Sequence, residues 1–163
     1  MINRDRPAVE DADTETLAGI SALWARLYDP LVRFAWLLVG DRAKAEDLVS
    51  STFLRTYGRL LALRDPEPYL RRALVNAARS EWRHEEAGLR ATAKLTVREE
   101  FDERLVELLD VLEALPHRQR AVVVLRHLYG YDDAAIAELL GCRVATVRSH
   151  ARHGLARLRE VLP

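Results

Sequence analysis

Five arginines and no acidic residue fall between residues 143 and 159 of the chain, namely Arg143, Arg148, Arg152, Arg157 and Arg159. Guanidinium groups donate paired hydrogen bonds to phosphates and to the edges of guanine bases. Arg148 and Arg152 are four residues apart, which places them on one face of a helix. The stretch therefore predicts binding to a polyanion. A solvated basic face of an ordinary helix is the other interpretation.

The charge of the whole chain hides this basic end. The 163 residues include 25 basic and 25 acidic side chains, so the formal net charge is zero. Residues 1–83 hold 13 basic and 12 acidic residues, residues 84–117 hold 4 and 9, and residues 118–163 hold 8 and 4. The three parts thus carry +1, −5 and +4. Such asymmetry favours a polyanionic partner for the C-terminal part.

The elements around the arginines predict a helix-turn-helix. Asp132 or Asp133 can cap a short helix that runs to Leu140, and Gly141 suits a sharp turn before a longer helix. Together Ala137, Gly141 and Val147 have the spacing that such a motif needs. The inward stripe of the second helix would be Val144, Val147, Ala151, Leu155 and Leu158.

The outward face of that second helix is the predicted DNA-binding surface. A recognition helix reads base edges in the major groove mainly with its N-terminal turns. The residues expected to contact duplex DNA are Arg143, Thr146, Arg148, Ser149 and Arg152. Arg143 stands at the cap position of the second helix, where Ser or Asp is preferred. Its positive charge also lies at the positive end of the helix, and a nearby phosphate would compensate for that repulsion.

The rest of the chain also shows helical periodicity. A tail is expected over residues 1–16, then a helix that Pro30 bends or breaks and Gly40 ends. A second helix begins after Asp41 and a third near Pro68, with a proline-containing loop between them. No segment alternates like a strand, so we expect an all-α protein. Its two small helical domains would cover residues 17–84 and 103–163, with an acidic linker over residues 85–102.

Several classes of function are disfavoured. The single cysteine, Cys142, allows no intrachain disulfide and disfavours a Cys/His zinc cluster, so no metal or cofactor is expected. No catalytic triad and no phosphate-binding glycine loop are present, so we expect no enzymatic activity and no catalytic residue. No apolar run is long enough to span a bilayer, and the first residues do not resemble a secretory signal. The expected location is the cytoplasm, without membrane insertion.

Three blocks resemble a known family. The segment "LDVLEALPHRQRAVVVLRHLYGYDDAAIAELLGCRVATVRSHARHGLARLRE" is similar to the −35-binding domain of sigma-70 family RNA polymerase sigma factors of the extracytoplasmic-function (ECF) group. Upstream, "GDRAKAEDLVSSTFLRTYGRL" resembles the helix that binds core polymerase. Between them, "PYLRRALVNAARSEWR" resembles the helix that binds the −10 promoter element.

The resemblance implies roles for individual residues. Core RNA polymerase would be bound by Asp47, Leu48, Phe53 and Leu54, and the −10 element by Arg72, Asn76, Arg79 and Arg83. Arg148, Ser149 and Arg152 match the −35 helix. Promoter DNA and core polymerase are thus the implied partners, and an anti-sigma factor is a further partner known in the family. Ser50, Ser51 and His150 depart from the usual residues of the group.

One alternative remains open from the residues alone. A helix-turn-helix repressor or activator, with an N-terminal helical bundle for sensing or dimerisation, would share the C-terminal pattern. Such a protein binds its operator unaided, usually as a dimer on a palindrome. A sigma factor binds core polymerase tightly and free promoter duplex poorly.

Overall fold

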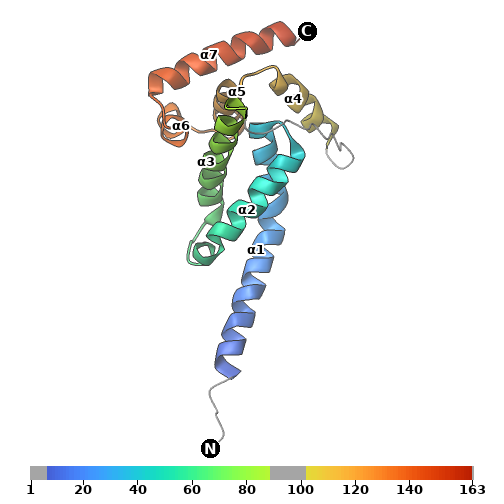
Figure 1. The fold of residues 1–163 in the computed structure, drawn as a ribbon, viewed down its shortest axis with the longest axis vertical. Helices are drawn as coiled ribbons and strands as arrows, with labels where there is room; N and C mark the ends of the chain where they lie inside the picture. The colour runs from blue at the N-terminus through green and yellow to red at the C-terminus, as the bar shows by residue number, and fades with distance from the viewer. Residues whose placement is uncertain (1–6, 89–101, 163) are drawn as a thin grey trace, which may run out of the picture.

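The computed structural model describes residues 7–88 and 102–162, with side chains from residue 15 onward. Every regular element in these ranges is a helix, which confirms the all-α prediction (Figure 1). No helix in the described ranges has the length and apolar character needed to cross a membrane.

The first three helices pack side by side. They are α1 (Pro7–Val39), α2 (Arg42–Leu60) and α3 (Pro66–Glu86). α1 ends at Gly40, whose φ of 73° is the left-handed conformation that glycine adopts without strain. The side chain of Asp41 then caps α2 by accepting a hydrogen bond from the Lys44 amide at 2.9 Å. Both features were predicted.

The bounds of two helices differ from prediction. α1 begins at Pro7, so most of the predicted tail is helical, and proline is well suited to a first helical position. α1 also continues through Pro30. Pro30 and Arg26 are both exposed, so water can satisfy the carbonyl that loses its intrahelical partner. α3 starts at Pro66, behind the cap Asp65, rather than near Pro68.

The second group contains α4 (Glu103–Glu113), α5 (His117–Val123), the π-helical turn η1 (Val124–Leu128), α6 (Asp133–Leu140) and α7 (Val144–Val161). α7 lies across the end of the molecule, over α5 and α6 (Figure 1). The β-branched segment 121–125 is helical, because all five of its side chains are buried and packing overrides their preference for strands.

The two groups of helices share one continuous hydrophobic core. The end of α1 contacts α5, and α3 contacts α6 (Figure 1). The sequence predicted two modules joined by a linker and gave no sign of this contact. The first residues of the predicted linker belong to α3, and residues 89–101 lie outside the described ranges.

Candidate nucleic-acid interface

The turn between α6 and α7 has the predicted geometry. Asp132 caps α6 by accepting a hydrogen bond from the Ala135 amide at 2.7 Å. Gly141 has a φ of 62°, and the Cys142 amide closes the turn by donating to the Ala137 carbonyl at 3.0 Å. This fixes the direction of α7 relative to α6, as a helix-turn-helix requires.

The inward side of α7 holds it against the preceding helices. Val147 and Ala151 are buried, as predicted, whereas Val144, Leu155 and Leu158 are only half-buried. Gly154, which the sequence did not single out, is also buried. A Cβ at Gly154 would stand 3.0 Å from Val123 Cγ2, so glycine permits the close approach of α7 to α5.

The opposite side of α7 presents the predicted DNA-binding residues together. Arg143, Arg148 and Arg152 are exposed, and Thr146 and Ser149 are half-buried. Arg143 occupies the N-cap position and makes no side-chain capping bond, as expected. Arg148 Nε contacts the Asp133 carboxylate at 3.2 Å, which ties it to the first turn of α6.

His150 adds no fixed positive charge to α7. Burial lowers the pKa of His150 below the usual value of a histidine, and the neighbouring Arg118 and His153 lower it further. His150 is therefore neutral at pH 7 and contributes no cation to this helix.

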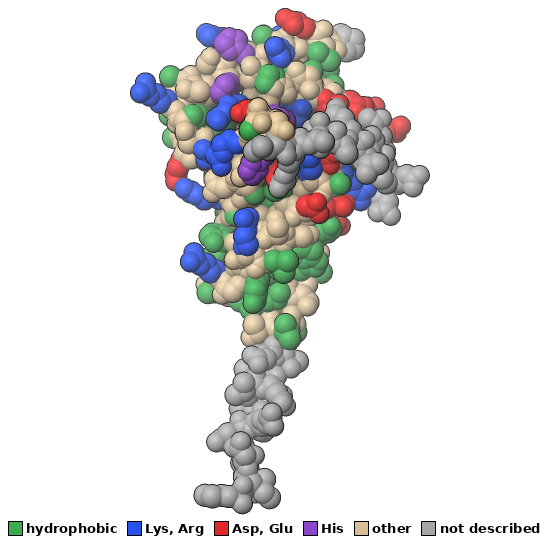
Figure 2. All heavy atoms as spheres, viewed as in Figure 1, with side chains coloured by type: hydrophobic (Ala, Val, Ile, Leu, Met, Phe, Trp, Pro, Cys, Tyr) green, Lys and Arg blue, Asp and Glu red, His purple; other side chains and the backbone are tan. Residues whose placement is uncertain are grey.

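A second basic face lies on α3. Arg72, Asn76, Arg79 and Arg83 follow one side of the helix, and all but the half-buried Arg79 are exposed. Basic side chains are concentrated on the side of α3 and α6 in Figure 2, whereas acidic ones gather on the side of α4. Two of the α3 arginines contact α6: Arg72 Nη2 lies 2.6 Å from Glu138 Oε1, and Arg79 Nη1 donates to the Leu139 carbonyl at 3.2 Å.

The four residues predicted on α2 separate into two kinds. Asp47 and Leu54 are exposed, and Leu54 is 69% accessible. Leu48 and Phe53 are 9% and 5% accessible and belong to the core, where the Phe53 ring packs edge-on against Trp24 at 4.8 Å. The structure thus leaves Asp47 and Leu54 accessible on α2 and buries the side chains of Leu48 and Phe53 in the bundle.

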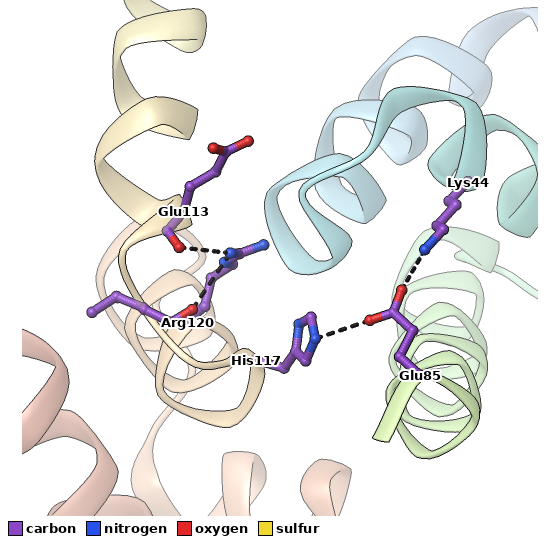
Figure 3. Close-up of polar contacts among 6 residues, drawn as sticks. Lys44, Glu85, Glu113, His117 and Arg120 are labelled. Atoms are coloured by element: carbon purple, nitrogen blue, oxygen red, sulfur yellow. Dashed lines mark hydrogen bonds and ion pairs between the residues drawn. The ribbon is translucent and has the colours of Figure 1, made fainter. Parts of the chain in front are cut away.

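A polar cluster joins the two groups of helices (Figure 3). The Glu85 carboxylate lies between Lys44 of α2, in a short contact, and His117 Nε2 of α5, at 3.0 Å. The His117 ring stacks on Trp82 with centroids 5.7 Å apart. Burial lowers the pKa of His117, although the Glu85 carboxylate opposes that effect. The cavity beside this cluster measures about 490 Å³.

Arg120, also drawn in Figure 3, is 6% accessible, and the sequence did not mark it. Its guanidinium donates to the carbonyls of Leu112, Glu113 and Leu115 at 3.0, 3.5 and 3.4 Å. These carbonyls lie at and beyond the C-terminal end of α4, where carbonyls lack the usual partner one turn further along the helix. The Leu112 carbonyl also accepts from the Leu115 amide at 3.0 Å. Burial lowers the pKa of Arg120, but an arginine stays charged at neutral pH.

Sites for metal are absent from the described ranges, where no three His, Cys, Asp or Glu side chains are grouped as ligands. Cys142 is a half-buried free thiol in the helix-turn-helix turn.

Comparisons with known proteins agree with this geometry. Residues 23–87 match the family described as sigma-70 region 2, and residues 105–158 match sigma-70 region 4. The RNA polymerase sigma-E factor of Streptomyces coelicolor is 37% identical over 143 residues, which cover 82% of this chain and 80% of that protein. The ECF RNA polymerase sigma factor SigL of Mycobacterium tuberculosis is 31% identical and covers 89% of this chain and 92% of its own.

The chain belongs to the sigma-70 family of RNA polymerase sigma factors, in the ECF group. Two solved structures share the fold of this sigma factor. They are RpoE bound to the anti-sigma factor NepR from Bartonella quintana and CnrH bound to the cytosolic domain of CnrY, with TM-scores of 0.61 and 0.59 and 22% identity in both cases. These alignments cover 94% and 98% of this chain, and 97% of each solved chain.

The sigma factor therefore binds core RNA polymerase and promoter DNA and directs transcription initiation. Proteins of this family are initiation factors rather than classical enzymes. The alternative of a helix-turn-helix repressor or activator is not favoured, since region 2 and region 4 occur together and in order.

Proposed function

We propose that this sigma factor recognises its promoters with two separate helix faces. In this division α7 binds duplex DNA at −35, α3 binds the −10 element, and α2 binds core polymerase. The observation that carries the proposal is the arrangement on α7, where exposed Arg148 and Arg152 lie opposite buried Val147 and Ala151. The helix thus offers a cationic edge of the width that a major groove accepts.

On α7, Arg148 and Arg152 would reach guanine edges or phosphates, and Thr146 and Ser149 would make shorter contacts. Arg143 precedes the helix. The N-terminus of a helix favours a negative charge, and a bound DNA phosphate would supply it there. A bidentate arginine–guanine contact contributes about 1–3 kcal/mol of base discrimination.

On α3, Arg72, Asn76, Arg79 and Arg83 would bind the −10 element as it opens. Opening costs on the order of 1.4 kcal/mol for each base-pair step. Stacking of an unpaired base on protein recovers about 1–3 kcal/mol. A cavity beside the loop between α2 and α3 is lined by Arg26, Leu61, Leu63 and Arg64, and its mixture of apolar and cationic groups suits an unstacked base and its phosphate.

On α2, the exposed Asp47 and Leu54 would contact core polymerase directly. The buried Leu48 and Phe53 would act on that contact through the position of the helix. An exposed leucine beside exposed charges fits a protein partner better than it fits DNA.

The wider assignments are proposals of the same kind. Residues 17–84 and 103–163 would act as the two domains and residues 85–102 as an acidic linker, and the matched ranges 23–87 and 105–158 support these bounds. The protein would work in the cytoplasm, where polymerase and DNA meet, and would contribute binding energy without a covalent step. We also propose an anti-sigma partner, since one structural neighbour, RpoE, was solved in complex with the anti-sigma factor NepR.

Run-off transcription with purified core polymerase and the native upstream region tests the α7 assignment. Arg152→Gln should reduce promoter-dependent transcript about 5- to 150-fold at limiting protein, which corresponds to about 1–3 kcal/mol. Arg159→Gln, which removes the same charge from the last turn of α7, is the matched control and should change it less than about threefold. Equal effects of the two substitutions would show that α7 attracts DNA by charge alone and would contradict its reading of the −35 element.

A further inference from the structure

Asp133, in the first turn of α6, lies between two arginines from different elements. Its Oδ2 is 3.2 Å from Nε of Arg148, on α7, and its Oδ1 is 2.6 Å from Nη2 of Arg126, in η1. The contact with Arg148 is also a hydrogen bond, in which the guanidinium donates. The carboxylate therefore links the first helix of the helix-turn-helix to an arginine of the second.

The Asp133 carboxylate is itself held in place from its inner side. Its side chain is 17% accessible, and its Oδ1 is buried and forms no hydrogen bond within the described ranges, so the charge of Arg126 compensates it. The side chain of Arg126 is 34% accessible and that of Arg148 is 71% accessible. Because the inner contact is the shorter and the less exposed one, Arg126 fixes the carboxylate, and the carboxylate then directs Arg148.

A guanidinium that is held through Nε keeps both of its terminal amino groups for a second partner. An arginine has five N–H donors, and Nε carries one of them. Two parallel N–H donors are what the O6 and N7 atoms of guanine accept in the major groove. A bond at Nε also limits the rotation that an arginine side chain would otherwise lose on binding. The contact with Asp133 thus leaves Arg148 able to read a guanine and lowers the entropic cost of doing so.

The other two exposed arginines of this surface are held differently. Among the residues that the structure describes, no carboxylate pairs with Arg143 or with Arg152. Each of them can therefore turn toward whichever phosphate or base the DNA presents, and phosphate contacts carry no sequence information. Reading a base requires a side chain with a defined direction, and Arg148 has one before any DNA is bound.

We propose that Asp133 is a positioning residue for −35 recognition, which orients Arg148 toward one guanine and so sets the sequence preference at that base pair. The proposal rests on the proposed function of α7. A carboxylate near DNA repels phosphates, so Asp133 weakens the general attraction of this surface while it improves selectivity. The two effects have opposite signs. A residue that merely stabilised the fold would change both in the same direction.

Asp133→Asn tests this role with little change of shape. A carboxylate has two accepting oxygens, whereas an amide has one oxygen and an amino group that donates. Arg126 and Arg148 both need an acceptor, so the single amide oxygen can serve one of them. The closer Arg126 takes it, and the amino group then faces Arg148, which has no acceptor. Asp133→Asn should therefore release Arg148, while the cap of α6 at Asp132 is unchanged.

The test uses holoenzyme assembled from core polymerase and the full-length sigma factor. Holoenzyme of the unmodified chain first selects its promoter from a pool of duplexes with randomised sequence. Run-off transcription at limiting holoenzyme then compares that promoter with variants in which each base pair of the −35 element is changed in turn. Arg148→Gln identifies the base pair that Arg148 reads, because the preference at that position should be lost.

We expect Asp133→Asn to lower the preference at that same base pair about 3- to 10-fold, because a charge-assisted bond no longer orients Arg148. Binding to a duplex without promoter sequence should be unchanged or tighter. Glu138→Gln is the matched control, since it removes an equal charge from the same helix at a residue that pairs with Arg72. It should change the preference at every position by less than about twofold. Asp133→Asn should have no further effect in the Arg148→Gln background.

An NMR measurement on the free protein tests the orientation without DNA. The Nε–H signal of Arg148, assigned by its loss in Arg148→Gln, should exchange with water faster in Asp133→Asn than in the unmodified chain. Circular dichroism of each variant confirms that the helices are retained.

The outcomes separate this proposal from the function assigned to α7. If Asp133→Asn changes the preferences no more than Glu138→Gln does, or lowers them equally at all positions, the positioning role is wrong. If Arg148→Gln itself leaves every −35 preference intact, the assignment of Arg148 to the −35 element is wrong, and the role of Asp133 falls with it.

Discussion

The Tyr129 ring meets the Phe34 ring edge to face, with an interplanar angle of 82° and centroids 4.8 Å apart. Phe34 lies in α1 of region 2 and Tyr129 directly follows η1 in region 4. The pair therefore joins region 2 to region 4 of the sigma factor, and no solvent reaches Phe34. Its geometry is the one in which the positive edge of one ring faces the negative face of the other.

Tyr129→Ala should uncouple the unfolding of the two regions. An aromatic pair contributes about 0.5–1.5 kcal/mol beyond the area that it buries. We expect the urea unfolding transition to broaden or to separate into two steps, followed by circular dichroism. Tyr57→Ala, at an exposed tyrosine of α2, should leave the transition unchanged. A single sharp transition for both variants would show that the Phe34 contact does not couple the regions.

The packing of the two groups of helices against each other should weaken in mild acid because of His117, which contacts Glu85 and Trp82 of α3. Burial holds the pKa of His117 below the value near 6.5 of a free histidine, and the charge of Arg120 lowers it further. The carboxylates of Glu85 and Glu86 act in the opposite direction. The neutral form of the His117 ring is thus favoured when region 2 and region 4 are packed together. The contact between the two groups of helices is therefore most stable above pH 6.5. It weakens as the pH falls through that value, because His117 binds a proton more readily when the two groups are apart.

Energy transfer between dyes on α2 and α7 measures this dependence between pH 7.5 and pH 5.5. The dyes are attached at exposed positions through Ala43→Cys and Ala156→Cys, and Cys142→Ser removes the native thiol. The signal should fall with pH in the unmodified chain and should be nearly constant in His117→Gln. An increase of energy transfer in acid would mean that the Glu85–His117 ion pair dominates and that the assigned direction is wrong.

Arg120→Met should destabilise region 4 strongly. The substitution leaves the carbonyls of Leu112, Glu113 and Leu115 without their buried donor, and each lost bond of this kind costs about 1–3 kcal/mol. We expect a loss of about 2–4 kcal/mol in the free energy of unfolding, from urea denaturation. Arg118→Met, two residues earlier and exposed, should change it by less than about 0.5 kcal/mol.

Two glycines inside helices should respond differently to alanine. A Cβ at Gly58 of α2 meets no atom within 4 Å, so Gly58→Ala should stabilise the protein by about 0.5–1 kcal/mol through helix propensity. A Cβ at Gly154 would crowd Val123 at 3.0 Å. We expect Gly154→Ala to be less stable than Gly58→Ala by at least about 1 kcal/mol in thermal unfolding.

The local features of the fold were predictable from the sequence. Asp132, Gly141 and Val147 act within a few residues of the chain, so their spacing alone determines the cap, the turn and the buried position of the helix-turn-helix. In the sequence of α2, Leu48, Thr52 and Phe53 also recur at helical spacing, which indicates one inward-facing side. The structure agrees with that pattern, although the family resemblance had placed Leu48 and Phe53 at the polymerase contact.

The contacts between the regions could not be predicted in this way. Arg72 and Glu138 are 66 positions apart, and no local pattern indicates that they meet. Arg120 has the sequence environment of a solvated arginine. Its burial follows from the end of α4 at Ala114, where carbonyls without helical partners lie within reach of the next helix.

The assignment of −10 binding to α3 and −35 binding to α7 is tested most directly by promoter opening with the polymerase holoenzyme. The measurement is the fluorescence of 2-aminopurine placed in the −10 element, which rises when the base unstacks, with holoenzyme carrying Arg79→Gln or Arg152→Gln. Arg152→Gln should require more holoenzyme but reach the full amplitude at saturation, whereas Arg79→Gln should bind the promoter and retain a reduced amplitude. The same defect in both variants, whether in binding alone or in amplitude alone, would contradict the assignment of separate tasks to the two helices.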